Sequence, residues 1–111
     1  MPAPEGLETF TAENWDREVL RSKLPVVVGF WADWCQPCKV LVPTIEAVAD
    51  QYQGRLKVGK VNVEENDAVA FRYDIRTLPT LMLFQKGQVS EQRVGLITKD
   101  KLVQLIEPLL A

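Results

Sequence analysis

A short apolar segment at residues 25–31 constrains the fold of this chain most strongly. It reads PVVVGFW, which is too short for a buried helix, and its β-branched and aromatic residues favour a strand. Its side chains do not alternate between apolar and polar, which is typical of a strand covered on both faces. The segment is therefore predicted to be the middle strand of a sheet.

Helical and extended segments alternate along the rest of the chain, which predicts an α/β fold. Apolar residues recur at helical spacing from Cys35, through Val40, to a terminating Gly54, and Pro43 is expected to kink this helix. Further helices are predicted to begin at Thr11, to span residues 67–73 and to begin at Thr98, and further strands at residues 56–63, 80–85 and 88–94. The last strand is expected to be an edge strand, antiparallel to the one before it.

Length and charge exclude several classes of protein. A chain of 111 residues is long enough for one core, so residues 1–111 are expected to form a single domain. The formal net charge is −2, whereas nucleic-acid-binding proteins usually carry an excess of positive charge. No apolar run is long enough to span a membrane, and residues 1–6 contain no leader pattern. We expect a cytoplasmic monomer that binds neither nucleic acid nor a membrane.

The cysteines carry the chemistry of this sequence, which contains no histidine. Cys35 and Cys38 are separated by two residues and stand where the predicted central strand gives way to a helix. The first amides of a helix lack internal partners and carry the positive end of its dipole, so they are expected to stabilise a thiolate at Cys35. Cys35 is the candidate nucleophile, and Cys38, deeper in the helix and more buried, is the candidate resolving thiol.

The cysteine pair has two other possible interpretations. A zinc site needs more ligands than two thiols supply, so no metal is expected. A structural disulfide would close too short a loop to stabilise the chain much, and the lack of other cysteines is typical of a reducing compartment. The sequence has no glycine-rich phosphate-binding motif, so no nucleotide or flavin cofactor is expected either. Redox chemistry is the favoured interpretation.

Residues 30–39, FWADWCQPCK, resemble the active-site segment of the thioredoxin family. Further residues stand in the order found in that family, and the resemblance extends from about Leu7 to the end of the chain. They are Pro43 in the long helix, Lys60 on a strand, the segment IRTLPT at residues 75–80, Gly87 in a hairpin and Gly95 near the cysteines. The resemblance implies a thioredoxin fold, in which a central mixed sheet of about four to five strands is flanked by about four helices.

The resemblance also implies a protein-disulfide reductase. A disulfide between Cys35 and Cys38 would form and break reversibly while disulfides in partner proteins are reduced. An external thioredoxin reductase, dependent on NADPH or on ferredoxin, would restore the dithiol. Gln36 and Pro37 lie between the cysteines, where the family tunes its reduction potential.

A substrate groove is implied by the same resemblance. Trp34, Leu78, Pro79 and Gly95 would border it, with a cis peptide bond between Leu78 and Pro79. The backbone of Leu78 would pair with an extended substrate as an added strand. From its position in a strand, Trp31 is expected to belong to the core, whereas Trp34 is as suited to packing as to substrate contact.

The chain departs from the family pattern at position 29. A buried aspartate that pairs with the strand lysine is usual there, and this chain has Gly29. Without that carboxylate we expect Lys60 to lack its partner and to assist proton transfer itself, and mixed disulfides to resolve slowly. The alternative is that Gly29 only makes room for a neighbouring side chain or a water.

Gln36 is a second departure, because the family most often has glycine at this position. The change can shift the reduction potential, but its sign does not follow from the sequence. Two further functions therefore remain open. One is a more oxidising or isomerising enzyme of the same fold, and the other is a partner-binding or redox-regulatory module with weak general reductase activity.

Overall fold

A mixed sheet forms the centre of the computed structural model, which describes residues 7–110. Its five strands are β1 (Leu7–Thr9), β2 (Val26–Trp31), β3 (Lys57–Asn62), β4 (Thr80–Gln85) and β5 (Gln88–Val94), in the order β1-β3-β2-β4-β5. β1 and β2 run parallel to β3, whereas β4 is antiparallel to β2 and to β5. β2 is thus the middle strand, as predicted. Residues 1–6, in which we recognised no leader, lie outside the described residues.

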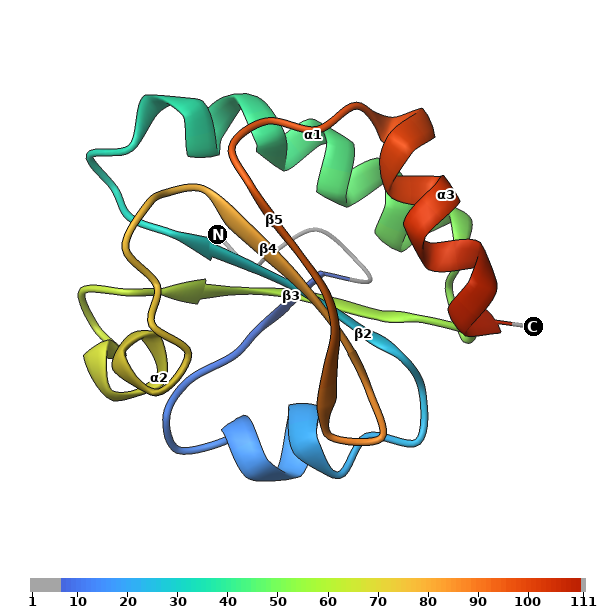
Figure 1. Ribbon diagram of the computed structural model, residues 1–111, viewed down its shortest axis with the longest axis horizontal. Coiled ribbons are helices and arrows are strands. Elements are labelled where there is room, and N and C mark those ends of the chain that lie inside the picture. The colour runs from blue at the N-terminus through green and yellow to red at the C-terminus, as the bar shows by residue number, and fades with distance from the viewer. Residues whose placement is uncertain (1–6, 111) are drawn as a thin grey trace.

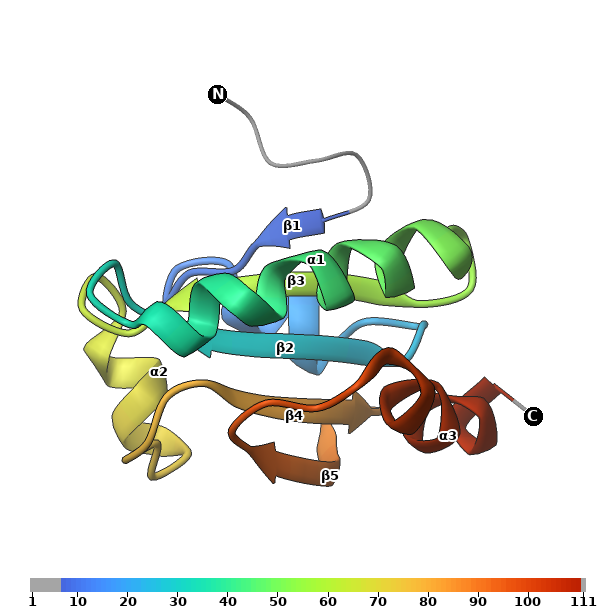
Figure 2. The same cartoon turned by 90° about the horizontal axis from the view of Figure 1, so that it is seen from above.

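Helices cover both faces of the sheet, which confirms the predicted α/β layers (Figures 1 and 2). The helices α1 (Gln36–Gln51) and α3 (Lys99–Leu110) lie on one face, and η1 (Asp16–Leu20) and α2 (Asp67–Arg72) lie on the other. None of the helices found between residues 7 and 110 is long and apolar enough to cross a membrane.

Each face of β2 lies in a hydrophobic core of its own. Val27 belongs to the core formed with α1 and α3, where it joins Ile45 and Ile106. Val26 and Val28 belong to the opposite core, around Trp15. Because both faces are covered, β2 has no position for an outward polar side chain, which explains why its sequence does not alternate.

The first helix differs from its prediction. The side chain of Thr11 does accept a hydrogen bond from the amide of Asn14 at 3.1 Å, as an N-terminal cap would. Regular helix nevertheless begins only at η1, a π-helix in which the amide of Arg21 donates to the carbonyl of Asp16 at 2.9 Å. Trp15 and Val19 of this segment are buried against the sheet.

Candidate active site

The cysteines lie at the junction between β2 and α1. Cys35 is the N-cap residue of α1, and it forms a disulfide with Cys38 across a Cα–Cα distance of 5.4 Å. The amide of Cys38 donates a hydrogen bond to Cys35 Sγ at 3.2 Å. Pro37 lies in the first turn, where a residue without an N–H leaves no hydrogen bond unmade. The Sγ atom of Cys35 is therefore held at the positive end of the helix, as predicted.

The burial of the two cysteines differs from the prediction. Cys38 was expected to be the more buried, but both residues are 3% exposed. The physical reason is that the disulfide and the Cys38 amide draw Cys35 Sγ onto the first turn of α1. In this disulfide form, neighbouring Trp34 is 67% exposed. The Trp34 indole is therefore not part of the hydrophobic core.

A second loop brings the predicted groove residues to the disulfide. The peptide bond between Leu78 and Pro79 is cis, as the resemblance implied. The amide of Gly95 donates to the carbonyl of Pro79 at 2.8 Å, and Gly95 has a φ of +89°. Pro79 and Cys38 line one small cavity. Pro79 thus lies between the cysteines and the Gly95 loop, while Leu78 is half-buried beside it.

Lys60 reaches the same cavity from β3. The cavity measures about 10 Å³ and is lined by Lys60, Cys38, Trp31 and Gly29 among others, and a volume of this size is at the lower limit for one water. Lys60 Nζ lies 4.9 Å from the centroid of the Trp31 ring. Trp31 was expected in the core, but it is only half-buried. Its ring faces the Lys60 ammonium group and lines this cavity.

Gly29 has two structural consequences. Among residues 7–110, no ion pair or side-chain hydrogen bond of Lys60 is found, which agrees with the expected loss of its partner. A Cβ atom at position 29 would lie 3.1 Å from Ile45 Cδ1 and 3.6 Å from Leu81 Cδ2. The room left by Gly29 is thus taken up by Ile45, which supports the alternative explanation of this glycine as well.

Exposed apolar side chains around the Gly95 loop were not predicted from the sequence. Val40, assigned to the apolar repeat of the long helix, is 64% exposed, because it lies one residue off the face that buries Leu41 and Ile45. Val94 and Leu96, on either side of Gly95, are 57% and 58% exposed. Leu96 and Ile97 directly follow Gly95 in the sequence. Two apolar residues in a loop were the signal from which this exposed apolar surface could have been predicted.

The remaining predicted site residues are Gln36 and Pro37, and both are exposed at the start of α1. Neither makes a side-chain hydrogen bond within residues 7–110. Across the same described part of the chain, no cluster of three or more histidine, cysteine, aspartate or glutamate side chains could hold a metal ion.

Comparison with known proteins agrees with this site. The thioredoxin family model matches residues 6–108. The chain is similar to thioredoxin 1 of Nostoc sp., at 46% identity over 87% of the chain and 91% of the relative. It is also similar to the thioredoxin of Pseudomonas aeruginosa, at 40% identity over 93% of the chain and 95% of the relative. It is similar as well to the thioredoxin of Rickettsia bellii, at 43% identity over 86% of the chain and 91% of the relative.

The match covers nearly the whole described chain, and the disulfide occupies the turn between central strand and helix. We conclude that this chain belongs to the thioredoxin family of protein-disulfide reductases, with Cys35 and Cys38 as its active-site cysteine pair.

Proposed function

We propose that Cys35 is the nucleophile and Cys38 the resolving thiol of a general disulfide reductase. The Cys35 thiolate attacks one sulfur of a substrate disulfide, and the other substrate sulfur leaves as a thiolate. The Cys38 thiolate then attacks Cys35 Sγ in the mixed disulfide and releases the first substrate sulfur. The substrate gains two electrons, and the pair is left as the Cys35–Cys38 disulfide. Attachment of Cys35 to the N-terminus of α1 is the observation that carries this assignment.

The groove that receives the substrate is assigned to Trp34, Leu78, Pro79 and Gly95. Support comes from the exposed indole of Trp34 and from the hydrogen bond that joins Gly95 to the cis-proline loop. An extended substrate segment would pair with the backbone of Leu78, which precedes the start of β4 at Thr80. Gln36 and Pro37, both exposed, would tune the reduction potential from between the cysteines.

Lys60 is assigned to proton transfer at the resolving step. Its ammonium group faces Trp31 in the cavity that Cys38 also lines. A nearby positive charge favours the thiolate form of Cys38. Without a carboxylate at Gly29 to accept the proton, resolution of mixed disulfides should nevertheless be slow.

A single domain at residues 1–111 would work as a monomer in the cytoplasm, where a dithiol stays reduced. A thioredoxin reductase, dependent on NADPH or ferredoxin, would return two electrons to the disulfide. No metal, nucleotide or flavin is assigned to this chain, because the proposed exchange needs only thiols.

Reduction of insulin disulfides by the reduced protein tests this function, with Cys35→Ser and Cys38→Ser as the two variants. We expect rapid reduction by the natural protein and none by Cys35→Ser. Cys38→Ser should form mixed disulfides that persist. Folded natural protein with two titratable thiols but no reductase activity would contradict the proposal, and it would favour a partner-binding module.

A further inference from the structure

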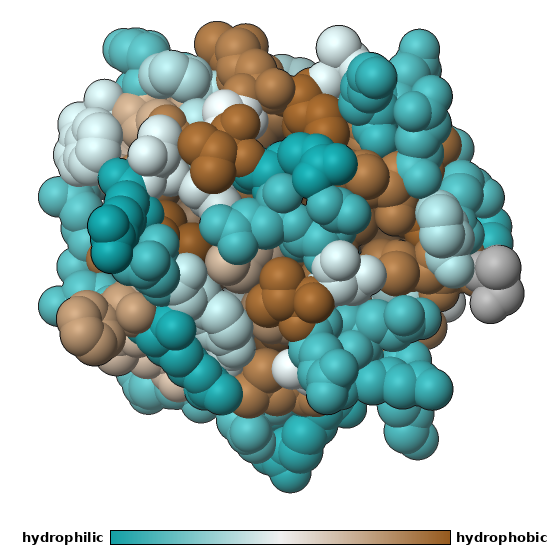
Figure 3. Space-filling model, viewed as in Figure 1, coloured by the Kyte–Doolittle hydropathy of each residue, from teal (hydrophilic) through white to brown (hydrophobic). Residues whose placement is uncertain are grey.

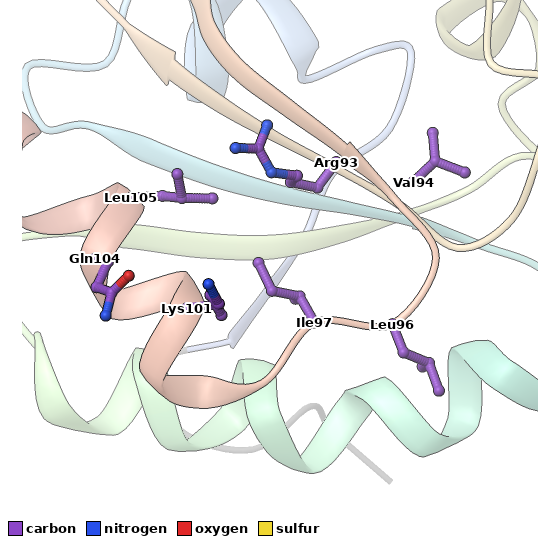
Figure 4. A pocket seen from close by; sticks show the side chains of 7 residues that line it. All are labelled: Arg93, Val94, Leu96, Ile97, Lys101, Gln104 and Leu105. Atoms are coloured by element: carbon purple, nitrogen blue, oxygen red, sulfur yellow. The ribbon is translucent and has the colours of Figure 1, made fainter.

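A hollow of about 350 Å³ lies between β5 and α3, beside the Gly95 loop (Figure 4). Polar side chains from both elements and apolar side chains of the loop and the helix line it. They are Arg93, Lys101 and Gln104, and Leu96, Ile97 and Leu105. In Figure 4, the residues of α3 stand on one side of the hollow, opposite Arg93 and the loop residues. The hollow therefore combines hydrogen-bond donors with an apolar lining.

This hollow is linked to the cis-proline loop through the residues around Gly95. A second hollow, of about 310 Å³, lies between the same loop and α1 and shares Leu96 and Ile97 with the first. The loop itself is joined to the cis-proline loop, because the Gly95 amide donates to the Pro79 carbonyl. A substrate segment that crosses the Gly95 loop from the cysteines would therefore reach the hollow at Leu96 and Ile97. On the outer surface, hydrophobic side chains lie next to hydrophilic ones in this region (Figure 3).

The charges in the hollow favour one class of partner group. Arg93 forms an ion pair with Glu91 of the same strand. Lys101 is exposed, and within residues 7–110 it makes no ion pair, so its charge is available to a ligand. Gln104 adds an amide donor one turn further along α3. A carboxylate on a short aliphatic stem matches both these donors and the apolar lining.

We propose that this hollow binds an acidic side chain of the substrate protein, close to the disulfide that is reduced. The inference rests on the proposed reductase function and adds a substrate preference to it. Lys101 attracts the carboxylate, while Leu96 and Ile97 contact its aliphatic stem. Because the site is open to solvent, the gain is that of a partly exposed ion pair. It should weaken as salt screens the charges.

Disulfide-linked peptides test the preference directly. A series of peptides carries one Glu, moved stepwise along either side of the cysteine, and a matched series carries Gln at the same position. We expect kcat/KM for one or two adjacent positions to be about 2- to 5-fold higher with Glu than with Gln. High salt should abolish the difference. Lys101→Gln should bring the Glu/Gln ratio close to one, and Glu91→Gln, which frees Arg93, should raise it.

Lys99→Gln is the matched control, because it removes the same charge from the same helix outside the hollow. This variant should keep the Glu/Gln ratio of the natural protein. Equal rates for Glu and Gln peptides at every position would overturn the acidic preference while leaving the reductase function intact. If Lys99→Gln and Lys101→Gln lowered the Glu/Gln ratio equally, the preference would come from the net charge of the protein and not from the hollow. That result would also overturn the proposal. Failure to reduce any peptide would instead count against the proposed function.

Discussion

At the scale of single residues, Gly29 decides the surroundings of Cys38, the proposed resolving thiol. The absence of a side chain lets Ile45 fill the space next to β2, 3.1 Å from the place of the missing Cβ. It also leaves the Lys60 ammonium group with the Trp31 ring as its neighbour. An aromatic face attracts a cation, but it accepts no proton from a thiol. Cys38 therefore shares its cavity with a lysine and not with a carboxylate.

Gly29→Asp should therefore speed the resolving step. The matched control is Gly29→Asn, which forces the same shift of Ile45 and adds no carboxylate. We expect Asp to resolve a mixed disulfide about tenfold faster than Asn, because a positioned base accepts the Cys38 proton. Release of a chromophoric thiol from Cys35 after rapid mixing measures this rate. Equal or slower resolution in Gly29→Asp would show that the missing carboxylate does not limit the protein.

Lys60→Met tests the positive charge itself. Removing the ammonium group should slow resolution by about tenfold at neutral pH, because the Cys38 thiolate loses a stabilising charge. The rate–pH profile should shift to higher pH, a change that loss of packing alone would not cause. Lys39→Met, at an exposed position beside the cysteines, is the control and should leave the profile in place. An unmoved profile in Lys60→Met would exclude a role for this lysine in proton transfer.

At the scale of elements, the β4–β5 hairpin holds the strand that leads to the Gly95 loop. Its two connecting residues, Lys86 and Gly87, have φ angles of +53° and +80°. Positive φ at both central positions is what a type I′ turn requires, and its twist matches that of the two strands. A Cβ atom on Gly87 would also lie 2.8 Å from the carbonyl oxygen of Leu20. The hairpin is therefore packed against the end of η1 at a point where only glycine fits.

Gly87→Ala should lower the free energy of unfolding by about 2–3 kcal/mol, because strain in φ and a contact with backbone add together. Gly54→Ala is the matched control. Gly54 has a φ of +81°, but nothing lies within 4 Å of its added Cβ. It should cost only about 1 kcal/mol. Urea unfolding measures the loss of stability in both variants. Equal losses would show that the backbone at Leu20 shifts without a cost in free energy.

At the scale of the whole molecule, two polar contacts tie segments that are distant in sequence. Tyr52, buried at the end of α1, donates a hydrogen bond to the carboxylate of Glu107 on α3. The pKa of Tyr52 is raised by that hydrogen bond and by burial. On the opposite face, Lys57 Nζ donates to Glu18 Oε1 at 3.2 Å, which joins η1 to β3. The first contact joins two helices on the same face of the sheet, and the second joins a helix to a strand of the sheet.

The Glu18 contact makes stability depend on pH. The pKa of Glu18 is lowered from 4.5 by hydrogen bonds from Arg17 and then from Lys57. A lowered pKa in the folded state means that the stabilisation is complete above the unfolded value and is lost as pH falls through the folded value. Glu18→Gln should therefore cost about 0.5–1 kcal/mol at pH 7 and almost nothing at about pH 3.

Urea unfolding at several pH values, with Glu13→Gln as the control, measures this dependence. Glu13 is exposed, so its variant should follow the natural protein at every pH. A Glu18→Gln deficit that persists in acid would show that the side chain contributes by packing rather than by charge.

The order of the elements and the reactive pair were predictable, because both depend on local patterns. Residues 25–31 predicted the central strand, since only a strand covered on both faces has no polar side of its own. The position of Cys35 before a helical repeat predicted its place at the start of the helix, since helical spacing is visible in the sequence. The π-helix at η1 was not predictable, because its register follows from the burial of Trp15 and Val19 against the sheet.

The sequence by itself thus determined the layers of this protein and the identity of its reacting thiols, because periodicity and spacing are properties of the chain alone. Only the tertiary structure decided that Ile45 fills the space beside Gly29, that Trp31 faces Lys60, and that the Gly95 loop opens into a hollow with Lys101. These contacts join residues from different elements, and packing, rather than local propensity, sets which side chains meet.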